Sequence, residues 1–232
     1  MSIISVASQC HHNAVARERW GIEVKLKLHG MTYSNYYNMV KAIMIEKGME
    51  FEEVHVLPNQ EPDFLLKSPM GKVPLLESEQ GFLTETAVMI DYIDSLDVGV
   101  ALYPADPFLR AKVRELIRHL ELYIELPARR LYGDVFFGKP ASEELKAQVK
   151  LQLHKGFSSL LELAKFDPYL AGKELSYADF YYRFSVGLAT IVCKKALAWD
   201  ALNELPHIKE LLDLMGERES IQKVLSDQAR DA

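Results

Sequence analysis

Cysteine is scarce in this sequence of 232 residues, which contains only Cys10 and Cys193. Two cysteines exclude a disulfide framework, and they leave no Cys-x-x-Cys pair for redox or metal chemistry. Such low usage is typical of the reducing cytoplasm, where we expect this protein. None of the seven histidines has a second histidine at i, i+4 spacing with a carboxylate between them, so we predict no metal site.

Long apolar runs and an excess of positive charge are also missing. No run reaches the roughly 18 apolar residues of a membrane helix, so we expect no membrane span. The net charge is −6, with 27 Lys and Arg against 33 Asp and Glu, which argues against nucleic acid as a partner. Hydrophobic residues make up 49% and charged residues 26%, as in ordinary globular proteins. This length favours two modest domains.

Residues 1–22 show no sustained hydrophobic period. Polar, charged and apolar residues are mixed there, and the apolar core of a signal peptide is missing. We therefore interpret residues 1–22 as an extension outside the fold, which is either disordered or the product of a misassigned start.

Residues 23–97 alternate between the patterns of strands and helices. Val24–Leu28 alternates as a half-buried strand does, a helical period runs from Ser34 to a stop at Gly48, and Phe51–Leu57 is again a strand. Such a strand, helix and strand unit predicts parallel pairing through a right-handed crossover. A short helical segment, a hairpin and another helix complete an α/β domain, at Glu61–Lys67, Val73–Leu83 and Glu85–Leu96.

Residues 98–107 read as a linker, and residues 108–232 read as an all-helical domain. Apolar residues recur at helical spacing, and further helices begin after Ser176 and at Pro206. Ser176 and Asp179 form a capping-box pattern, so we assign Asp179 to structure rather than catalysis. The predicted helices without such start signals span Leu109–Ile124, Leu145–Leu163 and Ser220–Gln228.

Five motifs stand in an order that resembles the cytosolic glutathione S-transferases along residues 23–215. They are SNYYNMVKAIMIEKG from Ser34, SPMGKVPLL from Ser68, LTET from Leu83, LYPADP from Leu102 and LSYADF from Leu175. The serine-led first motif is similar to a bacterial branch of that superfamily. This resemblance implies a thioredoxin-like N-terminal domain that binds glutathione, a helical bundle C-terminal domain, and a homodimer.

The resemblance also implies a set of contacts to glutathione. Val73, joined to Pro74 by a cis bond in the family, would pair through its backbone with the cysteinyl part. Glu85 would take the α-ammonium, and Thr86, at a helix N-terminus, the γ-glutamyl carboxylate. Lys72 is a candidate for the glycyl carboxylate. Each of these roles has a structural alternative: Pro74 as an ordinary turn proline, Thr86 as a simple helix cap and Lys72 as a solvated lysine.

Ser34 is the candidate catalytic residue. A cysteine thiol has a pKa of about 8.5, and lowering it by about two units takes roughly 2.7 kcal/mol. One hydrogen bond to the anion supplies roughly 1.5 to 3 kcal/mol and a helix N-terminus roughly 0.3 to 1, so a hydroxyl there suffices. The tyrosine and cysteine positions of other family branches hold His29-Gly30 and Tyr36 here. A cap without catalytic function, and help from Tyr33 or Tyr36, remain open alternatives.

The predicted function is conjugation of glutathione to a small hydrophobic electrophile. Two alternatives share the fold: a non-catalytic interaction module, and a glutathione-dependent isomerase or reductive dehalogenase. Five residues of the helical half are expected to line the electrophile's pocket between the domains, namely Tyr123, Arg130, Tyr132, Phe136 and Phe137.

Overall fold

The structure is a computed structural model that describes residues 25–231 and divides into two compact units. The first unit holds the elements up to Leu102 together with α12 (Glu219–Arg230), and the second runs from Tyr103 to Arg218. The interpretation of residues 1–22 lies outside the described residues.

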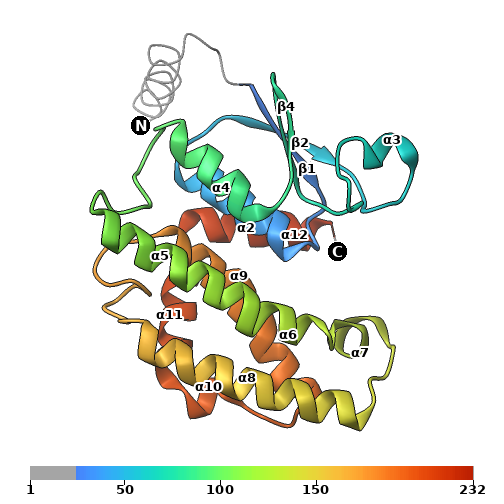
Figure 1. Ribbon diagram of the computed structural model, residues 1–232, viewed down its shortest axis with the longest axis vertical. Helices are drawn as coiled ribbons and strands as arrows, with labels where there is room; N and C mark the ends of the chain where they lie inside the picture. The colour runs from blue at the N-terminus through green and yellow to red at the C-terminus, as the bar shows by residue number, and fades with distance from the viewer. Residues whose placement is uncertain (1–24, 232) are drawn as a thin grey trace. The chain divides into compact units, whose positions relative to one another are not determined.

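A four-stranded sheet forms the centre of the first unit, with the order β2-β1-β3-β4 (Figure 1). β1 pairs in parallel with β2 and antiparallel with β3, and β3 and β4 form a hairpin. The parallel pairing and the hairpin predicted from the sequence are therefore confirmed. The strands span Leu26–Gly30, Phe51–His55, Leu75–Ser78 and Gly81–Leu83.

The predicted end of the first strand before His29-Gly30 is wrong, because β1 includes both residues. Leu26, Leu28 and Gly30 alternate as its buried positions. Gly30 belongs to this buried face because the ring of Tyr37 occupies the space of a side chain. A Cβ atom on Gly30 would lie 2.4 Å from that ring. A glycine that ends a strand pattern in the sequence therefore continues the strand here.

Helices α2 (Asn35–Glu46) and α4 (Thr86–Ser95) pack on one side of the sheet, and α3 (Pro62–Leu65) lies in the connection from β2 to β3 (Figure 1). Their apolar residues form the core of this unit. Its fully buried members include Leu28, Met39, Val40, Ile43, Leu75 and Ile90.

The C-terminal helix α12 groups with the first compact unit, although the all-helical domain predicted over residues 108–232 contains it. It packs on α2, and its buried face contains Ile221 and Val224. An amphipathic pattern shows that a helix needs a partner surface but does not say which one. The other predicted domain boundaries remain predictions.

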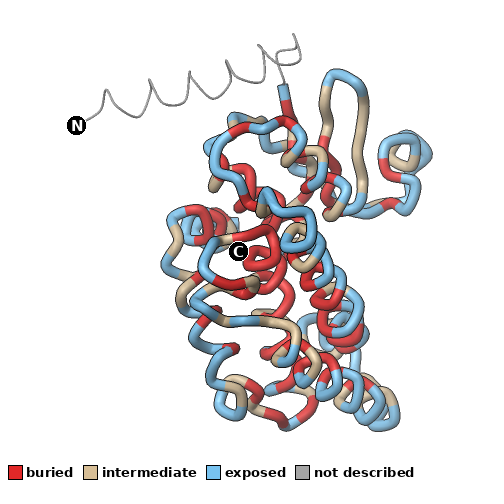
Figure 2. Tube along the Cα trace, turned by 60° about the vertical axis from the view of Figure 1, so that its left-hand side comes forward, coloured by how far each residue is buried: buried red, intermediate tan, exposed pale blue. Residues whose placement is uncertain are grey.

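The second unit is helical, and its longest helices are α8 (Glu143–Leu163) and α9 (Tyr177–Ala196). α9 packs against most of the other helices of this unit, and buried positions follow the inner helix faces (Figure 2). The short helices α6, α7 and α10 are absent from the sequence prediction. The remaining elements are α5 (Pro107–Leu120), the π-helical turn η1 (Glu121–Glu125), α6 (Leu126–Arg129), α7 (Tyr132–Phe137), α10 (Ala201–Glu204) and α11 (Pro206–Gly216).

Asp179 acts in the cap of α9, as the sequence predicts. Its carboxylate accepts hydrogen bonds from the backbone N–H of Ser176 at 2.8 Å and of Leu170 at 2.7 Å, and from the Ser176 hydroxyl at 2.9 Å. Burial raises the pKa of Asp179 to about 6, although these hydrogen bonds favour the charged form. The structural assignment of Asp179 is confirmed.

The long helix predicted over Leu109–Ile124 changes into the π-helical turn η1 near its end. Pro127 has no N–H to donate to the carbonyl of Tyr123, four residues earlier. α8 passes close to this carbonyl at Gly156, where a Cβ atom would lie 2.2 Å from the Tyr123 oxygen. The buried ring of His119 contacts the Gly156 carbonyl at 2.9 Å. The close contact between α8 and η1 therefore requires glycine at position 156.

We predict that Gly156→Ala lowers the free energy of unfolding by about 1 to 3 kcal/mol, because the added methyl group overlaps a backbone oxygen. Gly216→Ala is the matched control, since it lies in α11 with nothing within 4 Å of its Cβ position. The control should gain up to about 1 kcal/mol from helix propensity. Denaturant unfolding of both variants measures the difference, and equal stabilisation of both would contradict the close approach.

Candidate functional site

The sheet register brings the predicted site segments to one end of the sheet. β1 runs toward Ser34, the antiparallel β3 begins just after Pro74, and β4 runs out toward Glu85. The segments at Ser34, Pro74 and Glu85 therefore all lie at the end of the sheet where β1 ends. The register pairs that establish this are His29 with Leu75 and Leu76 with Leu83.

Ser34 is the N-cap of α2. Its backbone is extended, and its Oγ accepts the N–H of Tyr37 at 3.3 Å. A hydroxyl has one donor and two acceptor positions, and the cap uses an acceptor. The O–H of Ser34 can therefore donate to an anion while the cap is kept. Capping and thiolate stabilisation, which the sequence analysis treats as alternatives, are compatible.

The neighbouring tyrosines differ in their surroundings. Tyr33 is exposed, and its hydroxyl donates to the backbone oxygen of Asp231 at 2.9 Å. Tyr36 is half-buried. Tyr37, which the sequence analysis did not single out, is buried and donates to Glu53 at 2.6 Å. Burial and the Glu53 carboxylate raise the pKa of Tyr37. The one signal for Tyr37 in the sequence was its position three residues after the predicted cap residue Ser34.

The loop before β3 leads to Val73, and hydrogen bonds to the backbone of the loop fix its conformation. Ser68 is buried, and its hydroxyl accepts the N–H of Lys72 at 3.1 Å and donates to the Lys72 carbonyl at 2.8 Å. Gly71 has a φ of +63°, and a Cβ there would lie 2.3 Å from the Asn59 carbonyl. The Val73–Pro74 bond is cis, as the resemblance implies. Lys72 itself is exposed.

Glu85 and Thr86 form the entry to α4. Glu85 is exposed with φ +66° and ψ +117°, and its side chain does not cap the helix. Thr86 is the first residue of α4 and is buried. A non-glycine residue in such a conformation costs about 1 to 3 kcal/mol, and such residues cluster at functional sites. The strained backbone and the missing side-chain cap are consistent with the predicted binding role of Glu85, which remains a prediction.

The residues expected to contact an electrophile lie in the second unit. Tyr123, Phe136 and Phe137 are exposed there. Tyr132 contacts Phe136 edge to face at 5.3 Å between ring centres, and its hydroxyl donates at 2.8 Å to the buried Glu125. Arg130, also exposed, donates to the side-chain oxygen of Gln152 at 3.0 Å.

Nucleophilic cysteine chemistry receives little support from the residues that the structure describes. Cys193 is buried, and burial raises the pKa of its thiol to about 12, so this thiol is not a nucleophile at neutral pH. Between residues 25 and 231, no three His, Cys, Asp or Glu side chains are grouped as metal ligands. In the same range no helix has the length and apolar character needed to cross a membrane.

Both halves of the chain match family models. Residues 28–100 match the glutathione S-transferase N-terminal domain, and residues 129–228 match the C-terminal domain. A glutathione S-transferase from Pseudomonas putida is 50% identical over 202 residues, which are 87% of this chain and 92% of that protein.

Solved structures of glutathione transferases share the fold. Glutathione transferase F2 from Populus trichocarpa has a TM-score of 0.73 at 20% identity, covering 88% of this chain and 99% of that chain. A glutathione S-transferase from Pseudomonas fluorescens has a TM-score of 0.71 at 22% identity, covering 84% and 96%. Because half of the residues are identical to the Pseudomonas putida protein over most of both chains, this chain belongs to the glutathione S-transferase family.

Proposed function

We propose that this chain is a glutathione transferase that joins the glutathione thiolate to an electrophilic carbon of a small hydrophobic compound. The observation that carries the proposal is the gathering of Ser34, Pro74 and Glu85 at one end of the sheet. A helix N-terminus, the loop that enters β3 and an exposed carboxylate meet there, and glutathione offers a thiol, a peptide backbone and an ammonium group to match them.

Glutathione would lie along the start of β3. The backbone N–H and C=O of Val73 pair with its cysteinyl part as an added strand would. The N-terminus of α4 at Thr86 receives the γ-glutamyl carboxylate, because unpaired N–H groups and the helix dipole favour an anion there. Glu85 accepts the α-ammonium, and the exposed Lys72 reaches the glycyl carboxylate as a point charge.

Ser34 would stabilise the reacting thiolate. Its O–H donates to the glutathione sulfur while its oxygen continues to cap α2. The sulfur attacks the electrophilic carbon, a C–S bond forms, and the leaving group departs with the electron pair of the bond that breaks. Both reactants are held together, so proximity supplies much of the rate.

We also propose a second substrate, a location and an assembly, which are supported by the family resemblance, the cysteine content and the exposed aromatic residues. Tyr123, Phe136 and Phe137 are large exposed hydrophobic side chains of the helical unit, which suits contact with an apolar electrophile. A cytoplasmic location agrees with the scarcity of cysteine. A homodimer is the assembly that the family resemblance implies.

We predict that Ser34→Ala raises the pKa of bound glutathione by about one to two units, because one charge-assisted hydrogen bond is lost while the helix dipole remains. Conjugation of an aryl halide at pH 6.5 should fall roughly ten- to a hundred-fold, with the affinity for glutathione nearly kept. Thiolate absorbance against pH and steady-state kinetics measure the two effects.

Ser142→Ala is the matched control, because Ser142 caps α8 through the N–H of Leu145 at 3.2 Å. Both variants should lose about 1 kcal/mol of stability with the cap, but only Ser34→Ala should change the thiolate. An equal thiolate pKa in parent and Ser34→Ala would transfer the role to Tyr33, Tyr36 or backbone donors. Absence of a thiolate near neutral pH in the parent would favour the non-catalytic interaction module.

We predict opposite effects of Glu85→Gly on stability and binding. Glycine tolerates a φ of +66°, so relief of strain should raise the free energy of unfolding by about 1 kcal/mol. Loss of the carboxylate should weaken glutathione binding at least about five-fold. Calorimetry and denaturant unfolding measure both quantities.

Asp97→Gly is the control for strain, since Asp97 is also exposed and has a φ of +57°. It should gain stability without a change in glutathione affinity. Glu85→Ala should lose affinity without gaining stability. Parent-like affinity in both Glu85 variants would remove Glu85 from the binding site.

We predict that the protein sediments as a homodimer at micromolar concentration. Sedimentation velocity over a dilution series measures this directly. A single species of about 26.4 kDa throughout the series would contradict the dimer.

A further inference from the structure

α12 is tied to α2 by a buried ion pair. The ammonium of Lys41 lies 2.8 Å from Asp227, and the two side chains are only 2% and 7% exposed. Ser220, near the start of α12, donates to Glu46 at 2.6 Å. Charged residues are rarely this buried unless they are paired. The contact is therefore a specific attachment of α12 to α2 and not a surface ion pair.

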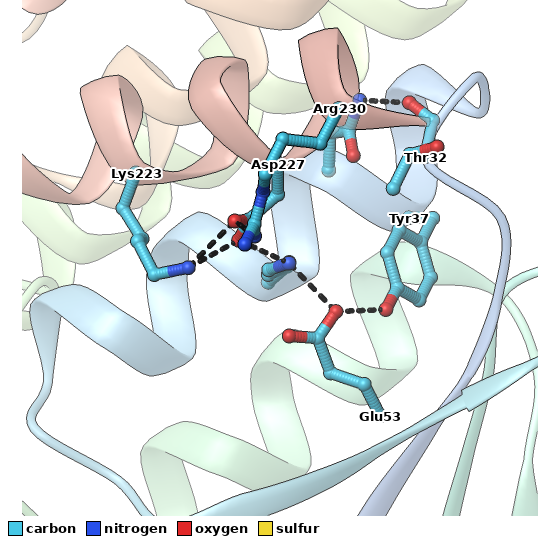
Figure 3. Close-up of polar contacts among 8 residues, drawn as sticks. Thr32, Tyr37, Glu53, Lys223, Asp227 and Arg230 are labelled. Atoms are coloured by element: carbon cyan, nitrogen blue, oxygen red, sulfur yellow. Dashed lines mark hydrogen bonds and ion pairs between the residues drawn. The ribbon is translucent and has the colours of Figure 1, made fainter. Parts of the chain in front are cut away.

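The same ammonium connects α12 to the sheet. Lys41 lies 2.6 Å from the carboxylate of Glu53 on β2. Glu53 also accepts the hydroxyl of Tyr37 at 2.6 Å, as Figure 3 shows. Asp227, Lys41, Glu53 and Tyr37 thus form one continuous series of polar contacts. It begins on α12 and ends in the first turn of α2.

Tyr37 connects this series to Ser34. Its backbone N–H is the group that the Ser34 hydroxyl caps, at 3.3 Å. Its ring packs where a side chain on Gly30 would otherwise stand. The side-chain amide of Asn38 donates to the Thr32 carbonyl at 2.7 Å, which holds the residues that lead into the cap.

Asp227 is well suited to a permanent contact. Burial raises the pKa of its carboxyl, but hydrogen bonds from Lys223 and Lys41 outweigh this and hold the pKa at about 2. Asp227 is therefore charged throughout the pH range in which a thiolate reacts. Lys223 and Arg230, both more exposed, complete its cationic surroundings (Figure 3).

We propose that α12 is a positioning element for the proposed catalytic serine. The contacts from Asp227 through Lys41 and Glu53 to Tyr37 hold the first turn of α2 in the geometry in which Ser34 meets the glutathione sulfur. This inference rests on the proposed function, and Asp227 acts as a positioning residue that touches neither substrate. Displacement of a reacting group by a fraction of an ångström is enough to slow catalysis severalfold.

The test is Asp227→Asn, which keeps the size of the side chain and removes its charge. We expect kcat to fall roughly three- to ten-fold and the pKa of bound glutathione to rise by about half a unit to one unit. KM for glutathione should stay within about two-fold, because Val73, Glu85 and Thr86 do not contact this series. Kinetics and thiolate absorbance are measured well below the melting temperature of the variant.

Asp213→Asn is the matched control. Asp213 pairs with Lys209 four residues earlier, as Asp227 does with Lys223, but both side chains of that pair are more than half exposed. This control should keep the parent values. Asp227→Glu, which retains a carboxylate, should recover most of kcat.

Glu53→Gln provides a second route if Asp227→Asn does not fold. It weakens the contacts to Lys41 and Tyr37 and should also raise the thiolate pKa. Glu52→Gln, next to it on the same strand, removes an exposed pair with Lys27 and should change nothing.

The outcomes separate this inference from the proposed function. A parent protein without a thiolate near neutral pH removes both. A normal parent, combined with variants at Asp227 and Glu53 that lose stability but keep kcat and the thiolate pKa, would falsify the positioning role alone. In that case α12 only stabilises the fold.

Discussion

The antiparallel pairing of β3 with β1 decides where every proposed contact to glutathione lies. His29 opposite Leu75 places the start of β3 beside the end of β1. Because side chains alternate along a strand, a shift of one residue would turn each β3 side chain to the opposite face of the sheet. The cis bond before Pro74, the cap at Ser34 and the turn at Glu85 depend on this register for their common position at one end of the sheet.

Backbone groups carry much of the proposed binding, and the fold maintains them at some expense of stability. The left-handed conformations at Gly71 and Glu85 illustrate two solutions. At Gly71 a glycine removes the strain, and the Asn59 carbonyl leaves no room for another residue. At Glu85 the strain is kept, and we propose that the carboxylate there is retained to bind glutathione. Thermodynamic stability and ligand recognition are therefore opposed at Glu85 but not at Gly71.

Local patterns in the sequence predicted the elements well, and long-range partners poorly. Periodicity and capping signals identified the parallel pair, the hairpin and the Ser176–Asp179 cap, because each follows from patterns within one element or from the connection between consecutive elements. The motifs pointed to the segments of the candidate site. The attachment of α12 to α2 was missed because Lys41 and Asp227 are 186 residues apart. The π-helical turn before Pro127 was not predicted, and neither was the close approach of α8 to it at Gly156.

The neutralisation of Lys41 limits what can stabilise a thiolate in this protein. Its ammonium lies within hydrogen-bond distance of two carboxylates, so little of its charge is left to act on a bound anion. Tyr37 already donates to Glu53, and burial keeps its hydroxyl protonated. The proposed stabilising groups are therefore the O–H of Ser34 and the N-terminal N–H groups of α2, with Tyr33 and Tyr36 as the alternatives. The stabilisation that a hydrogen bond or a helix dipole gives to an anion depends steeply on geometry. This dependence explains why a buried ionic network would hold the first turn of α2 in place rather than contribute charge.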